Sequence, residues 1–148
     1  KRLAEEKLQI TLALSLHGSS QEKRQELMPI AYQYDLSEVL AACEEYFEKT
    51  GRRITFEYSL VQGVNDTAED AARLIKMLGH MNCHMNLIPV NPIKERAFQK
   101  PSRKNAEEFK NKLEHNGINV TIRRERGSDI DGACGQLRRR HITSKKEN

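Results

Sequence analysis

The feature that most constrains this chain is the alternation between two hydrophobic periods along its length. Four stretches carry apolar side chains at every second position, as half-buried strands do, and they span residues 9–17, 53–60, 84–90 and 118–122. Helix-like stretches separate them, each closed by a glycine or a proline. Strands that alternate with helices are typical of βαβ units, whose right-handed crossovers place neighbouring strands in parallel. The pattern therefore predicts an α/β fold with a mainly parallel sheet.

Capping residues predict where the helices begin and end. Ser19 followed by Glu22 has the spacing of a capping box, and Pro29 ends this short helix. Three longer helices are predicted over residues 35–50, 67–78 and 105–116, and a glycine follows each of them. Cys43 lies on the apolar stripe of the first of these three, so we expect it in the core.

Length and charge distribution suggest one domain that ends in a basic tail. A chain of 148 residues suits a single domain, with strands and helices over residues 1–122 and a tail over residues 123–148. From residue 120 onward there are eight lysines and arginines against four acids, and this excess equals the net charge of +4 of the whole chain. A local basic excess of this kind permits a polyanionic partner.

The hydropathy pattern and the cysteines indicate a cytoplasmic protein. No apolar run approaches the roughly 20 residues of a membrane span, so no membrane contact is expected. Cys43, Cys83 and Cys134 are too far apart for a disulfide framework or a zinc ribbon. With no signal peptide in the sequence, we expect a reducing compartment in which each thiol matters individually.

Three polar clusters follow the predicted strands and suggest a ligand site. Ser15 and His17 close the first strand, Gly63–Asp66 follow the second, and Asn91 closes the third. Because βα loops gather at the carboxyl ends of parallel strands, we expect these clusters to converge. Each also has a structural interpretation: a hydrogen-bonded histidine at a strand end, a turn with a helix cap, and an Asn-Pro turn.

A metal site is not expected. His80, Cys83 and His84 have a spacing that would gather ligands on one face of a helix. However, Gly79 ends the preceding helix, so the three residues fall on the connection into the third strand. That connection lies at the end of the sheet opposite the predicted ligand site.

Cys134 is the candidate nucleophile. It lies in Gly132–Gly135, a polar segment without the apolar periodicity that would bury it. Arginines at positions 123, 124, 126 and 138–140 flank it and would favour a thiolate over a thiol. The alternative is a solvated basic tail with an incidental cysteine, and the window has no aromatic side chain for base stacking.

Four segments, in order along nearly the whole chain, resemble the RlmN/Cfr family of radical S-adenosylmethionine RNA methyltransferases, and among these the adenine-C2 (RlmN) branch most. They are Leu14–Gly18, Gly63–Asp66, Asn86–Pro92 and Gly127–Leu137. The last is the most specific, because a Gly-Ala-Cys-Gly-Gln-Leu run after an Arg-Gly-Ser-Asp element is rare elsewhere. The resemblance implies that the chain forms the C-terminal half of a partial (βα)6 barrel with a tail over its mouth.

The resemblance also implies an activity, cofactors and partners. It assigns contacts with S-adenosylmethionine to Ser15, Leu16, His17 and Asn91, and makes Cys134 the residue that is itself methylated during turnover. The product would be an adenine methylated at C2 in 23S rRNA, with tRNA as a further substrate. A 4Fe-4S cluster and an electron donor such as flavodoxin would serve the complete enzyme.

The sequence departs from a complete enzyme of this kind. Such an enzyme needs a Cys-x3-Cys-x2-Cys run for its cluster, whereas the cysteines here are at positions 43, 83 and 134. We therefore expect a C-terminal fragment that is inactive alone. Three alternatives stay open: the C8-methylating (Cfr-like) branch of the family, a non-catalytic RNA-binding module, and a binding domain for a small phosphate or nucleoside.

Overall fold

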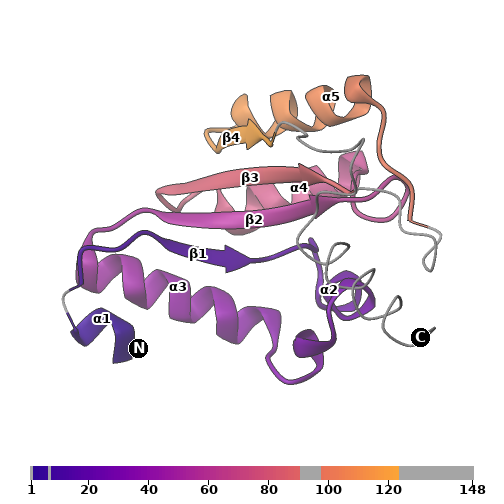
Figure 1. The fold of residues 1–148 in the computed structure, drawn as a ribbon. Coiled ribbons are helices and arrows are strands. Elements are labelled where there is room, and N and C mark those ends of the chain that lie inside the picture. Colours follow the sequence, from indigo (N-terminus) through magenta and orange to yellow (C-terminus); the bar gives the residue numbers. More distant parts are fainter. Residues whose placement is uncertain (1, 7, 91–97, 124–148) are drawn as a thin grey trace, which may run out of the picture.

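The computed structural model describes residues 2–6, 8–90 and 98–123, and these contain a four-stranded parallel sheet. The strands lie side by side in sequence order, which confirms the predicted α/β class (Figure 1). They are β1 (Leu12–Ser15), β2 (Ile54–Leu60), β3 (Cys83–Pro89) and β4 (Asn119–Ile122). Parallel neighbours require a crossover between each pair, and helices provide it.

The described helices are α1 (Arg2–Glu5), α2 (Gln21–Leu27), the 3-10 helix η1 (Pro29–Tyr32), α3 (Leu36–Thr50), α4 (Ala68–Leu78) and α5 (Arg103–Glu114). Helices α2, α3, α4 and α5 begin at side-chain caps. The hydroxyl of Thr67 accepts from the backbone of Asp70, whose carboxylate accepts in return from the backbone of Thr67, so α4 begins with a full capping box. None of the described helices is long and apolar enough to cross a membrane.

Three predicted boundaries are wrong. The first strand is four residues long instead of nine, because it pairs with β2 only from Leu12 to Ser15, and His17 beyond it has a left-handed φ of 56° that no strand continues through. Helix α5 starts at Arg103 instead of Asn105, because the hydroxyl of Ser102 is the cap and the N–H of Asn105 is the group it accepts from. The short helix likewise uses Ser20 as its cap.

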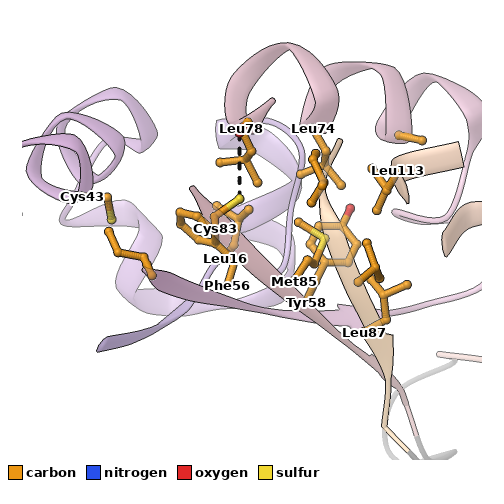
Figure 2. Close-up of a cluster of buried hydrophobic side chains, with 14 of the residues drawn as sticks. Leu16, Cys43, Phe56, Tyr58, Leu74, Leu78, Cys83, Met85, Leu87 and Leu113 are labelled. Atoms are coloured by element: carbon orange, nitrogen blue, oxygen red, sulfur yellow. Dashed lines mark hydrogen bonds between the residues drawn. The ribbon is translucent and has the colours of Figure 1, made fainter. Parts of the chain in front are cut away.

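One face of the sheet is packed against the long helices and forms the core. On β2 the side chains of Ile54, Phe56, Tyr58 and Leu60 are almost fully buried, while the residues between them are half-buried. The buried residues of α3, α4 and α5 join the same cluster, as Figure 2 shows for Cys43, Leu74, Leu78 and Leu113. Each large side chain buried in this way stabilises the fold by about 1.5–3 kcal/mol. Because the helices pack on this face, polar side chains lie on the opposite face of the sheet.

Candidate cofactor-binding site

A row of polar side chains crosses the face of the sheet that points away from the core. The strand register aligns Ser15 with Glu57, Glu57 with Asn86, and Asn86 with Thr121. The amide Nδ2 of Asn86 donates to Glu57 Oε2 at 3.0 Å, and the Thr121 hydroxyl lies 3.4 Å from Asn86 Oδ1. The row thus places a hydroxyl, a carboxylate, an amide and a second hydroxyl on four neighbouring strands.

His17 lies at the carboxyl end of β1 and is held in place at several atoms. Its ring Nδ1 accepts from the backbone N–H of Ser59 at 3.0 Å, and its own N–H donates to the carbonyl of Glu57 at 3.3 Å. Since Nδ1 is the acceptor, the neutral ring carries its proton on Nε2 and presents that N–H as a donor. A left-handed φ in a histidine costs free energy, and such residues are concentrated at binding and active sites.

Burial and a neighbouring cation both keep His17 neutral. Burial lowers the pKa of its imidazole below the ordinary value, and the nearby guanidinium of Arg24 lowers it further. Arg24 is itself buried in α2, and its Nε donates to the carbonyl of Leu16 at 3.1 Å. Helix α2 lies just past the arrowhead of β1 (Figure 1), so this arginine ties the helix to the end of the strand.

Asn65 connects the ends of β1 and β2. It is fully buried, and its Nδ2 donates to the carbonyls of His17 at 2.8 Å and Ser59 at 2.6 Å. Its Oδ1 accepts from the N–H of Val61 at 2.8 Å. The carbonyl of Asn65 accepts from the hydroxyl of Tyr58 at 2.8 Å. Burial of that hydroxyl is the main cause that raises the pKa of Tyr58 well above its ordinary value. The predicted turn at Gly63–Asp66 is confirmed, and its asparagine fixes the shape of the candidate site.

A buried carboxylate joins α2 to α4 beside this turn. Asp70 accepts from the hydroxyls of Ser19 and Thr67, and Lys23 Nζ lies 2.7 Å from its Oδ1. Burial alone would raise the pKa of Asp70, but these hydrogen bonds outweigh it and hold the pKa below its ordinary value. Lys23 also donates to the carbonyl of Val64 at 2.6 Å, so the first turn of α2 is fixed to the loop after β2.

The structure brings three of the five predicted site residues together. Ser15, Leu16 and His17 follow one another at the end of β1. The side chain of Leu16 is fully buried in the core, so any contact it makes with a ligand would use its backbone. Asn91 and Cys134 lie outside the described residues, as does most of the predicted tail, and their assignments stay predictions.

The structure places His80, Cys83 and His84 in separate surroundings, and the expectation against a metal site there stays a prediction. His80 Nε2 lies 2.9 Å from Glu44 Oε1, His84 Nε2 lies 3.0 Å from the hydroxyl of Thr121, and Cys83 is in the core. Nowhere in the described part of the chain do three metal-ligating side chains gather. Burial raises the pKa of the Cys83 thiol to about 11 and also raises that of Cys43, so neither thiol is a ready nucleophile.

Sequence reasoning missed the residues that shape this site. Glu57, Asn86 and Thr121 are the polar members of alternating strands, and only the register shows that they form one row. Arg24 looks like an ordinary polar residue of a helix, whereas Asn65 lies within the predicted Gly63–Asp66 cluster, although its hydrogen bonds could not be predicted. The alternation itself was the available signal, because the polar residues that alternate with apolar ones along a strand all face the same side of the sheet.

Comparison with known proteins confirms the resemblance. The chain is 60% identical over 142 residues to a protein of Lachnospira eligens named "Probable dual-specificity RNA methyltransferase RlmN", which covers 96% of this chain and 41% of that protein. A protein of Clostridium perfringens with the same name is 59% identical over 145 residues, covering 98% of this chain and 42% of that protein. The chain thus spans about two fifths of the length of these relatives. No family model matches the chain.

Solved structures agree with the partial barrel. A crystal structure of a radical SAM methyltransferase from Sphaerobacter thermophilus has a TM-score of 0.86 and 44% identity, over 91% of this chain and 40% of that one. A domain of a pyruvate-formate lyase-activating enzyme from Bacteroides vulgatus has a TM-score of 0.67 at 18% identity, over 84% of this chain and 74% of that one. The second likeness concerns the fold alone, and both match a parallel sheet of the barrel type.

Proposed function

We propose that this chain forms the C-terminal, cofactor-facing part of a radical S-adenosylmethionine RNA methyltransferase that methylates C2 of adenine. The observation that carries the proposal is the match, at about 60% identity over almost the whole chain, to proteins named as dual-specificity RNA methyltransferases. Adenines of 23S rRNA and of tRNA are the proposed substrates, and a flavodoxin-like protein is the proposed electron donor. The names of the relatives favour this reading over the C8-methylating branch.

The residues at the carboxyl ends of the strands fit S-adenosylmethionine. That cofactor has hydroxyl, amino and adenine groups, and the site offers the Ser15 hydroxyl together with the Nε2–H donor of His17. When bound, the cofactor supplies a methyl group and, after reductive cleavage, a radical. In this proposal Ser15, His17 and the backbone of Leu16 bind and orient it, with Asn91 as a fourth contact.

The residues present do not fit the 4Fe-4S cluster. Cys43 on α3 and Cys83 on β3 are both buried in the core (Figure 2), and the chain has no run of three closely spaced cysteines. The relatives are more than twice as long as the matched segment. The proposal therefore places the cluster ligands outside the 148 residues and assigns no step of the reaction with the cluster to this chain.

Cys134 is the proposed methyl carrier. C2 of adenine is electron-poor and has no lone pair that could attack a sulfonium directly, so the carbon has to be delivered from a nearby group. A cysteine thiolate can hold that carbon, and the arginines around Cys134 in the sequence favour the thiolate. This role separates an enzyme from a non-catalytic RNA-binding module, because binding alone needs no thiol.

A chimera tests the proposal. Residues 1–148 of this chain replace the matching segment of the Clostridium perfringens relative, and methylation of 23S rRNA and tRNA is followed by mass mapping of the modified base. We expect 2-methyladenine from the chimera, none from the chain alone, and none from a Cys134→Ala chimera whose RNA affinity is unchanged. Cys43→Ala, the same replacement at a buried thiol, is the matched control. Methylation by the Cys134→Ala chimera would overturn the carrier role, and 8-methyladenine would move the chain to the other branch.

A further inference from the structure

Three exposed cations of the described chain lie at the carboxyl end of the sheet. Arg103 and Lys104 are the first two residues of α5, which follows β3, and Arg123 comes directly after β4. Because β3 and β4 are parallel, the crossover between them starts at the carboxyl end of β3, and β4 ends on the same side. Figure 1 shows the start of α5 on the side to which the strand arrowheads point. We call these three residues the α5 basic surface.

The backbone that presents this surface is anchored to the sheet. Just before α5, the carbonyl of Gln99 accepts from the N–H of Gln62 at 2.9 Å, beyond the end of β2, and Pro101 is buried. The backbone N–H of Arg123 donates to the carbonyl of Leu87 on β3 at 2.8 Å. The cationic side chains therefore project from a fixed backbone, so a partner that binds them has to order only the side chains.

Contacts within the described chain make little use of these charges. Neither Arg103 nor Arg123 forms an ion pair with a described residue. Lys104 Nζ lies 3.8 Å from Glu108 Oε1, and both side chains are mostly exposed, so this pair contributes little to stability. The exposed acid at the start of the neighbouring α4, Glu69, is paired with an arginine of its own helix. The α5 basic surface thus keeps its positive charge.

Helix stability does not account for the two cations at the start of α5. The first turn of a helix is the positive end of its dipole, where acidic side chains are favourable and basic ones are not. The first turn of α5 has no acid and begins with Arg103 and Lys104. Residues that break a local rule without a compensating contact are expected at functional sites. We therefore looked for a partner with negative charge.

We propose that the α5 basic surface binds the phosphate groups of an RNA strand whose target adenine enters the candidate cofactor-binding site. This inference rests on the proposed function and adds the place where the RNA backbone lies. Lysine and arginine bind phosphates without regard to sequence, and such contacts fix the position of a strand while its bases stay free to react. A strand that delivers an adenine to the carboxyl end of the sheet has to pass over that end.

An acidic protein surface is the competing partner, and the electron donor would be an example. That protein has to approach the 4Fe-4S cluster, whose ligands the proposed function places outside the 148 residues. The adenine, by contrast, has to reach the carboxyl ends of the strands, where the α5 basic surface lies. This placement favours RNA over the electron donor.

Fluorescence anisotropy of a labelled RNA hairpin with adenines in its loop tests the inference on the chimera. Arg103→Gln/Lys104→Gln removes two positive charges from the α5 basic surface. Arg53→Gln/Lys76→Gln is the matched control, because it removes the same charge from exposed side chains at the other end of the sheet, before β2 and in the last turn of α4. Affinity is measured from about 0.1 to 1 M salt, and urea unfolding of each variant is followed in parallel.

We expect each lost phosphate contact to reduce the slope of log affinity against log salt by about 0.7–0.9. A slope of this size makes one contact worth about five- to eightfold in affinity at 0.1 M salt relative to 1 M. Arg103→Gln/Lys104→Gln should therefore bind the hairpin about 25- to 60-fold more weakly at 0.1 M salt and equally well at 1 M. Arg123→Gln should show the loss of one contact, and the control should match the unsubstituted chimera.

The urea midpoint separates binding from a structural role. Removing Arg103 and Lys104 should leave the midpoint unchanged or raise it, because the helix dipole no longer disfavours these side chains. A lower midpoint with an unchanged salt slope would make the two residues structural and would contradict the inference.

Two other results would contradict the inference, and one would contradict its premise. Equal losses in the Arg103/Lys104 variant and in the control would show that the hairpin responds to net charge alone. Unchanged hairpin affinity in the Arg103/Lys104 variant would remove the RNA contact, and loss of flavodoxin binding in that variant would assign the surface to the electron donor. If the unsubstituted chimera shows the expected salt dependence but forms no 2-methyladenine, the proposed function is wrong and the RNA contact stands.

Discussion

Replacing Asn65 with alanine should destabilise the fold and release the carboxyl end of β1. The buried side chain makes three hydrogen bonds, to the carbonyls of His17 and Ser59 and from the N–H of Val61. Alanine removes all three and leaves these backbone groups without their partner. The hydroxyl of Tyr58 is still bound, since it contacts the Asn65 carbonyl.

The expected loss follows from the number of groups affected. Each buried hydrogen bond contributes about 1 kcal/mol, and a buried polar group left without a partner costs more, about 1–3 kcal/mol. Three affected groups give a loss of about 3–9 kcal/mol. Because two of the three hydrogen bonds are only partly buried, we expect the lower part of that range, about 3–5 kcal/mol, which is a large share of the roughly 5–15 kcal/mol that stabilises a typical domain. Asn65→Asp should cost as much, because a carboxylate oxygen would then face two carbonyl oxygens.

Urea unfolding of the 148-residue chain, followed by circular dichroism, measures this loss. Asn116→Ala is the control, because that exposed side chain makes a single bond to the Lys112 carbonyl and its removal should change stability by less than about 0.5 kcal/mol. A loss for Asn65→Ala no greater than that of the control would refute the reasoning. The hydrogen bonds of the Asn65 side chain would then be a consequence of the turn and not its cause.

Two further predictions concern ionisable groups. Asp70→Asn should lower the free energy of unfolding by about 3–5 kcal/mol, because it leaves Lys23 without its buried partner. Urea unfolding measures this loss, with Glu69→Gln, at an exposed acid on the same helix, as the control. Equal losses for the two variants would argue against the prediction. Because the pKa of His17 is lowered in the folded chain, the unfolded chain binds a proton at this histidine more readily than the folded chain does. The contribution of His17 to the free energy of unfolding is therefore complete above about pH 6.5 and is lost as the pH falls through the lowered pKa. NMR titration of the His17 ring checks this, and a midpoint at or above 6.5 would contradict it.

The α/β class and the order of the elements were predictable because they depend on local patterns. The alternation on β2 places Phe56 and Tyr58 in the core and Glu57 between them, as the structure confirms. The exact end of β1 was not predictable, since Leu14 and Leu16 continue the alternation while the chain turns at His17. The turn is imposed by contacts from residues about 40–50 positions away, namely the Ser59 N–H and the Asn65 amide.

The sequence predicts the candidate site residues that lie at the ends of strands. It does not predict the residues that become neighbours only through the pairing of strands. Ser15 and His17 were predicted as site residues because carboxyl ends of parallel strands converge. Glu57 and Asn86 are 29 residues apart, and nothing local in either strand indicates which residue of the other it faces. A shift of one residue in the pairing of β2 and β3 would place Asn86 beside an apolar neighbour and move every side chain of one strand to the wrong face.

That register is itself set by the core, which links stability to the site. Phe56 pairs with Met85 and Tyr58 with Leu87, and all four are fully buried under α4 and α5. Tyr58 also stacks on Phe109 of α5, with ring centroids 5.9 Å apart. Because side chains alternate along a strand, fixing these apolar pairs on one face fixes the pairing of Glu57 with Asn86 on the other. A core substitution that lets β3 slip would therefore separate Asn86 from Glu57 without touching any residue of the polar row.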